Sequence, residues 1–306
     1  MSSISSISQF RLTNVQLGPF GHHTMSAIDL HLREASTLSS EPAPPKRKPA
    51  PKKSKIPVPF TYTSSDDGTD ENLLILLHGL GDTHDPFAKL GKSLKLPQTA
   101  TLALRGTQQL PWLDEPAFEW YTSFDLLGEP VPPSKVDPRP AFDLLEAVLA
   151  YLTSEECGKW PKEKIHFFGF AQGGSVALQI ALKMWKDALA AKQEPRRLGS
   201  IVSVNGPLLS HPTALSTPCT TPVHIAYRPQ PSSSTDSMSV TQATVSSIRK
   251  VFPNISESKM GPRGGMPSSK EEWEPIMRFW SENLGRRQSH RPGGDGALYE
   301  VMTNGI

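Results

Sequence analysis

The chain has 306 residues, enough for one large domain or two small ones, and a hydrophobic fraction of 37% suffices for a substantial core. The net charge of +2 gives no support for nucleic-acid binding. The two cysteines, Cys157 and Cys219, do not indicate a disulfide framework, so a reducing compartment is expected. No apolar run approaches the roughly 20 residues needed to cross a bilayer. We therefore expect a soluble, cytoplasmic protein.

Both ends of the chain are expected to lie outside the folded domain. Residues 41–55, EPAPPKRKPAPKKSK, cannot bury much apolar surface, which predicts an extended, solvated linker. A solubilising tether is the simpler explanation of this basic cluster, and a nuclear address or a contact with an anionic membrane surface are alternatives. The serine-rich start, with Arg11 and no acidic residue before Asp29, weakly suggests a mitochondrial presequence. A disordered tail, or translation that begins at Met25, is the simpler explanation of so generic a pattern.

Short apolar runs alternate with helical patterns from residue 73 onward. Residues 73–77 are wholly apolar and run into HGLGD, which is typical of a parallel strand buried on both faces. A helix over 85–94 and a second strand at 101–104 complete a strand–helix–strand unit. The segment 139–153 has apolar residues at helical spacing, and a strand over 164–168 follows it.

The same alternation continues to the end of the predicted domain. Two further strands are expected at 200–204 and 223–227, and a capping box of Ser268 and Glu271 marks the start of a final helix. This alternation indicates an α/β fold, in which helices cover both faces of a mostly parallel central sheet. We place the domain at residues 56–285, between an N-terminal tail and linker (1–55) and a flexible C-terminal tail (286–306).

A glycine-rich turn joins the strand at 164–168 to the following helix. Such a strand-to-helix elbow normally presents a serine nucleophile in the pattern G-x-S-x-G. Here the pattern is Gly169-Phe170-Ala171-Gln172-Gly173, and the central side chain has no nucleophilic atom. A Rossmann-type nucleotide site is not supported, because G-x-G-x-x-G and a phosphate-loop lysine are absent.

The motifs HGLGD and GFAQGG, in this order, resemble those of the carboxylesterase and acyl-protein thioesterase (phospholipase/carboxylesterase) family of α/β-hydrolases. Members of that family carry HGLGD and GFSQGG, and the resemblance spans roughly residues 57–284. It implies an α/β-hydrolase fold. Enzymes of this family hydrolyse carboxylic esters or palmitoyl-protein thioesters with a serine, a histidine and a carboxylate, and no metal or cofactor is implied. The resemblance also implies that the N–H groups of Leu80 and Gln172 bind the oxyanion. The loop that supports them would consist of His78, Gly79, Gly81 and Asp82, and His78 would hold it by hydrogen bonds. The glycines of the elbow would be Gly169, Gly173 and Gly174.

Three positions depart from the family pattern. Ala171 stands at the nucleophile position, and Pro267 stands where the family has its histidine base. The loop 227–232 lacks the expected aspartate, and the nearest carboxylate, Asp236, is more typical of a turn. No other histidine has the position expected for the base. The three absences together predict a natural non-catalytic member.

We therefore expect a pseudoenzyme that binds an acyl, lipidated or peptide ligand in the former substrate cleft. The alternative is an active carboxylesterase or thioesterase with a displaced nucleophile, for which Ser175 and Cys219 are candidates. Ser175 is one helical turn from Ala171, about 5–6 Å away, whereas attack requires placement within about an ångström. The residues proposed to line the cleft, which are equally compatible with a hydrophobic cluster, are Trp112, Leu113, Phe118, Trp120 and Tyr121.

Overall fold

The computed structural model describes residues 46–110, 115–125, 127–132, 135–210, 215–229, 240–262 and 265–287, and the backbone of 30–34 and 299–303. The chain divides into two compact units, Pro45–Arg287 and a second unit of Met1–Pro44 with Gln288–Ile306. In the second unit, β1 (Leu30–Glu34) pairs antiparallel with β11 (Tyr299–Thr303). The sequence predicted neither strand, because a pairing between such distant segments leaves no local pattern.

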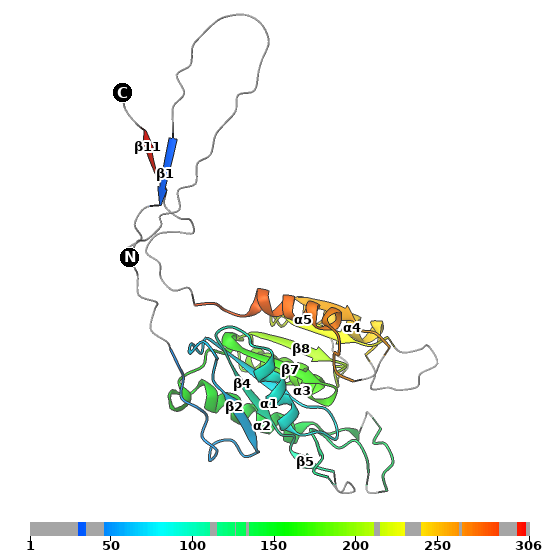
Figure 1. The fold of residues 1–306 in the computed structure, drawn as a ribbon. Helices are drawn as coiled ribbons and strands as arrows, with labels where there is room; N and C mark the ends of the chain where they lie inside the picture. The colour runs from blue at the N-terminus through cyan, green and yellow to red at the C-terminus, as the bar shows by residue number, and fades with distance from the viewer. Residues whose placement is uncertain are drawn as a thin grey trace, which may run out of the picture. The chain divides into compact units, whose positions relative to one another are not determined.

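A seven-stranded sheet forms the centre of the Pro45–Arg287 unit (Figure 1). Its spatial order is β10-β9-β8-β7-β3-β4-β2, and all neighbours are parallel except β2 and β4. The mostly parallel sheet is therefore confirmed; the sequence missed β2 and β10, the two edge strands, which lack a buried apolar run. The strands are β2 (Phe60–Thr63), β3 (Asn72–Leu77), β4 (Thr99–Leu104), β7 (Ile165–Phe170), β8 (Ser200–Val204), β9 (Val223–Tyr227) and β10 (Ile255–Lys259).

Strand β3 shows why the apolar runs are continuous. All its residues are buried, and Leu73, Ile75 and Leu77 belong to one core cluster while Leu74 and Leu76 belong to another. Because successive side chains point to opposite faces of a sheet, a strand covered on both faces is apolar at every position.

Helices cover both faces of the sheet, as predicted. In the cluster that contains Leu73, the sheet packs against α2 (Arg139–Thr153), α3 (Gln172–Ala190) and α4 (Gln242–Arg249). In the cluster that contains Leu74, it packs against α1 (His84–Ser93) and α5 (Lys270–Asn283). The unit also contains an antiparallel pair of short strands, β5 (Gln108–Gln109) and β6 (Phe118–Glu119), and the 3-10 helices Glu155–Cys157 and Lys162–Lys164. Within the described ranges, no helix is long and apolar enough to span a membrane.

Helix α5 starts one residue later than the predicted capping box. Its N-cap is Ser269, whose hydroxyl accepts a hydrogen bond from the Glu272 N–H at 3.4 Å. The Ser268–Glu271 prediction is therefore wrong by one position. The Glu272 carboxylate instead accepts a hydrogen bond from the Ser268 N–H at 2.8 Å.

Residues 46–55, the described part of the proline- and lysine-rich segment, pack against the domain. The Lys48 ammonium group lies 4.9 Å from the centre of the Trp160 ring, and long lysine stems can cover apolar surface in this way. Lys52 and Lys55 each place their ammonium nitrogen 2.9 Å from a Glu156 carboxylate oxygen. The compact unit begins at Pro45, so residues 46–55 belong to the domain, whereas the composition of 41–55 suggested a solvated linker. Three of its lysines are thus engaged within the chain.

Candidate functional site

The elbow between β7 and α3 keeps the backbone geometry of a nucleophile turn. Ala171 has φ 46° and ψ −115°, a conformation that costs a non-glycine residue about 1–3 kcal/mol. Its N–H donates to the Val204 carbonyl at 2.8 Å, and its carbonyl accepts from the Ser175 N–H at 3.0 Å. The turn is therefore held in the strained form although its central side chain has no hydroxyl.

Close packing explains the three glycines of the elbow. A Cβ atom on Gly169 would lie 2.3 Å from the Gly173 carbonyl carbon, and one on Gly173 would lie 2.4 Å from the Leu77 oxygen. A Cβ atom on Gly174 would lie 2.4 Å from Ser203 Oγ. These distances are too short for any side chain. The glycines therefore report how closely α3 approaches the sheet, and they carry no information about activity.

The buried His78 ring organises the loop after β3. Its Nδ1 lies 2.6 Å from the Gly79 carbonyl oxygen, and its Nε2 accepts a hydrogen bond from the Gly106 N–H at 2.8 Å. This pair of contacts fits the neutral tautomer with its proton on Nδ1. Burial lowers the pKa of His78 below its ordinary value, which also favours the neutral ring. Both nitrogens are occupied, so His78 has a structural role in the loop.

Two backbone N–H groups remain available beside the elbow. Among the described residues, neither the Leu80 N–H nor the Gln172 N–H donates a hydrogen bond to another group. The Gln172 side chain holds the neighbouring segment, because its Oε1 accepts from the Trp120 N–H at 2.8 Å and its Nε2 donates to the Tyr121 carbonyl at 3.0 Å. Two free donors on loops that are fixed in this way can receive a carbonyl oxygen or an oxyanion.

The position expected for the base holds a buried proline. The Pro267 carbonyl accepts a hydrogen bond from Trp273 Nε1 at 3.0 Å. His166 and His224 lie near the amino ends of β7 and β9 and bond the hydroxyls of Ser200 and Ser256, each at 2.8 Å. At about 3.3 Å per strand residue, His166 is about 13 Å and His224 about 10 Å from the carboxyl ends of their strands, the edge of the sheet where the elbow lies. Neither can act as a base there.

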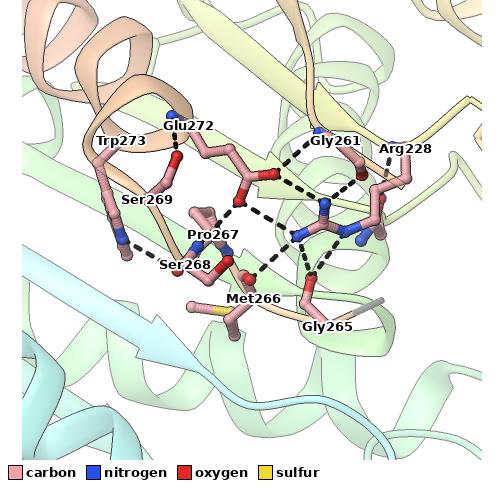
Figure 2. A network of polar contacts seen from close by, with 10 residues as sticks. Arg228, Gly261, Gly265, Met266, Pro267, Ser268, Ser269, Glu272 and Trp273 are labelled. Atoms are coloured by element: carbon pink, nitrogen blue, oxygen red, sulfur yellow. Dashed lines mark hydrogen bonds and ion pairs between the residues drawn. The ribbon is translucent and has the colours of Figure 1, made fainter. Parts of the chain in front are cut away.

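An ion pair joins the residue after β9 to the first turn of α5 (Figure 2). By the resemblance, the acid would follow β9 and the base would come just before α5. Arg228 directly follows β9, and its guanidinium nitrogens lie 2.9 Å and 3.3 Å from the Glu272 carboxylate oxygens. Both side chains are almost completely buried. Hydrogen bonds from Arg228, and then from the Ser268 N–H, lower the pKa of Glu272 to about 2.

The same two side chains fix the backbone of the loop between β10 and α5. The Arg228 guanidinium donates to the carbonyls of Gly261, Gly265 and Met266, the last at 3.1 Å. The Glu272 carboxylate accepts from the Gly261 N–H at 2.9 Å. A pair that is charged at neutral pH therefore lies where, by the resemblance, the aspartate of a hydrolase would hydrogen-bond its histidine and orient it. The sequence interpretation missed this pair, although an arginine directly after a strand was a visible signal.

Neither candidate for a displaced nucleophile has a partner that would activate it. Ser175 is fully buried, and its Oγ has no hydrogen-bond partner of normal geometry among the described residues. Cys219 precedes β9 and so lies at the amino end of the strands, the edge opposite the elbow. Its Sγ lies 3.5 Å from Thr221 Oγ1, and burial raises the pKa of the thiol. Asp236, the doubtful acid, lies outside the described residues.

The aromatic residues proposed to line a cleft are mostly core residues. Phe118, Trp120 and Tyr121 are buried, and the Trp120 indole donates to the His78 carbonyl at 2.8 Å. Trp120 and Tyr121 belong to the larger hydrophobic cluster, so the hydrophobic-cluster alternative fits these two side chains. Trp112 and Leu113 lie outside the described residues. Within the described ranges, no group of three or more His, Cys, Asp or Glu side chains could hold a metal ion.

Comparison with known proteins identifies the family. The sequence profile described as Phospholipase/Carboxylesterase matches residues 61–230, and the chain belongs to this family. It is 35% identical to an uncharacterized hydrolase of Mycosarcoma maydis, over 73% of this chain and 80% of that protein. It is 30% identical to an uncharacterized hydrolase of Schizosaccharomyces pombe, over 71% of this chain and 86% of that protein.

Solved structures agree with the fold. The crystal structure of Zea mays acyl-protein thioesterase 2 has a TM-score of 0.55 at 20% identity and covers 74% of this chain and 100% of its own. Esterase PE8 has a TM-score of 0.56 at 20% identity, with 74% and 98% covered. At this level of identity the likeness supports the α/β-hydrolase fold alone.

Proposed function

We propose that this chain is a non-catalytic member of its family that binds an acyl or peptide ligand through a carbonyl group. The carrying observation is the elbow itself: Ala171 keeps the strained turn, while the N–H groups of Leu80 and Gln172 have no partner among the residues that the structure describes. Loss of a triad nucleophile or base lowers kcat by about 10⁶, which is roughly 8 kcal/mol of transition-state stabilisation. Backbone N–H groups do not depend on side-chain identity, so they can bind the carbonyl oxygen of a ligand even though the site has no nucleophile.

The absence of a nucleophile is tested with a fluorophosphonate probe on the purified chain. We expect no covalent labelling, because Ala171 has no hydroxyl and Ser175 is buried without a base. Covalent labelling that is lost in Ser175→Ala would instead support an active hydrolase with a displaced nucleophile. That alternative rests on one observation: the buried Ser175 hydroxyl lies one helical turn from Ala171 and has no hydrogen-bond partner of normal geometry among the described residues.

Carbonyl binding is tested with a neutral acyl amide, N-lauroylglycinamide, by titration calorimetry. Leu80→Pro removes one N–H donor, and we expect several-fold weaker binding. Leu80→Ala keeps the N–H and is the matched control, since Leu80 is 38% exposed and its side chain contributes little to the core. Equal binding by both variants, or no binding by the wild type, would reject the proposed function.

A further inference from the structure

Arg105 lies directly beside the loop that carries Leu80. It follows β4, whose last residue Leu104 pairs with Leu77 at the end of β3. The next residue, Gly106, donates its N–H to His78 Nε2 at 2.8 Å. The chain therefore holds Arg105 at the carboxyl edge of the sheet, where ligands of open α/β folds bind.

A second contact fixes the Arg105 side chain toward the same loop. Its guanidinium carbon lies 4.0 Å from the centre of the Phe118 ring. Phe118 is itself bonded to the loop, because its N–H donates to the Asp82 carbonyl at 3.2 Å and its carbonyl accepts from the Gly81 N–H at 2.9 Å. The Gly106–His78 hydrogen bond and the contact with Phe118 together hold the Arg105 guanidinium beside the loop that carries Leu80.

The Arg105 charge has no partner among the described residues. The side chain is half-buried, forms no ion pair or hydrogen bond there, and its Nε is buried without an acceptor. The nearby acids have other contacts: Asp82 Oδ1 accepts from the Thr83 N–H at 2.7 Å, and Asp85 lies 3.6 Å from His84 Nε2. A half-buried guanidinium without a counterion is unfavourable, so the binding of an anionic group from a ligand would be strongly favoured.

Two other polar atoms near Arg105 also lack partners. His84 Nδ1 and Thr107 Oγ1 are buried and have no hydrogen bond within the described part of the chain. His84 begins α1, directly after the HGLGD loop, and Thr107 lies two residues beyond Arg105. Phe118 covers one face of the guanidinium but leaves its in-plane N–H groups free. A planar fork of donors matches the oxygens of a carboxylate or phosphate.

We propose that Arg105, with His84 and Thr107, forms a subsite for a carboxylate or phosphate group on the ligand whose carbonyl binds at Leu80 and Gln172. The subsite rests on the proposed function, and it specifies the ligand class: an acyl compound with an anionic group close to its carbonyl. The anion exchanges its hydration for charge-assisted hydrogen bonds with Arg105.

The test compares acyl ligands that differ only in charge. One pair is N-lauroylglycine and N-lauroylglycinamide, and the other is 1-lauroylglycerol 3-phosphate and 1-lauroylglycerol, so that the carboxylate and phosphate sources are separated. We expect the wild type to bind the anionic member of at least one pair about tenfold tighter, with a preference that falls as salt rises. Arg105→Gln should abolish the preference and leave the affinity for the neutral member unchanged.

Arg139→Gln is the matched control, since Arg139 is exposed, pairs with Asp137 and begins α2 on the other face of the sheet. Equal affinity of the wild type for both members of both pairs would overturn the subsite while leaving the carbonyl site intact. If the wild type binds only the anionic ligands, and Arg105→Gln abolishes this binding, then carbonyl binding is rejected and the anion subsite is supported. If the wild type binds none of the four ligands, both the carbonyl site and the anion subsite are rejected. If Arg105→Gln still prefers the anionic ligands, Arg105 is not the residue that binds the anion. If thermal unfolding shows that Arg105→Gln is destabilised, Arg105→Lys, which keeps the charge without the fork, should lose part of the preference.

Discussion

At the scale of single residues, Ala171 separates the shape of the elbow from its chemistry. The strained backbone persists because the glycines permit close packing and the Val204 carbonyl binds the Ala171 N–H. A nucleophile, by contrast, requires a hydroxyl and a base beside it. The residues that preserve the fold and those that perform the reaction are therefore different residues.

Ala171→Ser should not create an esterase. The serine would occupy a correctly shaped elbow, but the base position holds Pro267, and His78, His166 and His224 are engaged elsewhere. We expect hydrolysis of a p-nitrophenyl ester to stay at the wild-type level. Turnover clearly above the wild type, and retained when Ser175→Ala is added, would mean that a histidine reaches the elbow.

At the scale of elements, the Arg228–Glu272 pair determines how α5 and its preceding loop meet the end of β9. It ties the loop backbone at Gly261, Gly265 and Met266. Removal of one member of a buried pair leaves the other charge without compensation, which is far more costly than removal of an exposed pair.

Arg228→Met should lower the free energy of unfolding by about 3–5 kcal/mol. Arg278→Met is the control, because Arg278 pairs with Glu274 on the surface of the same helix, and such a pair contributes only about 0.3–0.5 kcal/mol. Denaturant unfolding measures both variants, and hydrogen exchange should increase across residues 261–268 only in Arg228→Met. A similar, small effect of the two substitutions would show that the buried pair does not hold the loop.

At the scale of the whole molecule, a sheet covered on both faces buries polar groups as well as apolar ones. His166 and His224 are enclosed between strands and helices, and burial lowers their pKa values to about 3 and about 4. Both rings are neutral in the folded protein at neutral pH. Their serine partners on β8 and β10 bond at least one nitrogen of each ring.

The stability of the domain should fall as the pH drops below about 6.5. The unfolded chain binds protons on these histidines near their ordinary pKa of 6.5, whereas the folded chain does not bind them until about pH 4 or below. Stability is therefore complete above pH 6.5 and declines toward pH 4, by roughly 3 kcal/mol for His224 alone. Urea midpoints at pH 7.5, 5.5 and 4.5 measure the decline, and His224→Asn should flatten it. Equal midpoints at pH 7.5 and 4.5 would contradict the expectation.

The sequence by itself determined the fold class, the buried strands, the elbow and the absence of a serine at its centre. These features depend on local patterns, since apolar runs follow the burial of each strand and the glycines follow the tight turn between β7 and α3. The edge strands, the packed segment before residue 56 and the α5 cap were decided by contacts that leave weak or no local patterns.

Only the tertiary structure decided what occupies the remainder of the site. Arg228 and Glu272 are 44 residues apart, and their pairing depends on how β9 and α5 approach each other. Likewise, the order of strands in the sheet determines the burial of Ser175 and the distance of Cys219 from the elbow. It also determines the position of the Arg105 guanidinium, which has no partner within the described ranges. The physical reason is the same in each case: a charge or a nucleophile acts through its neighbours in space, and those neighbours come from distant parts of the chain.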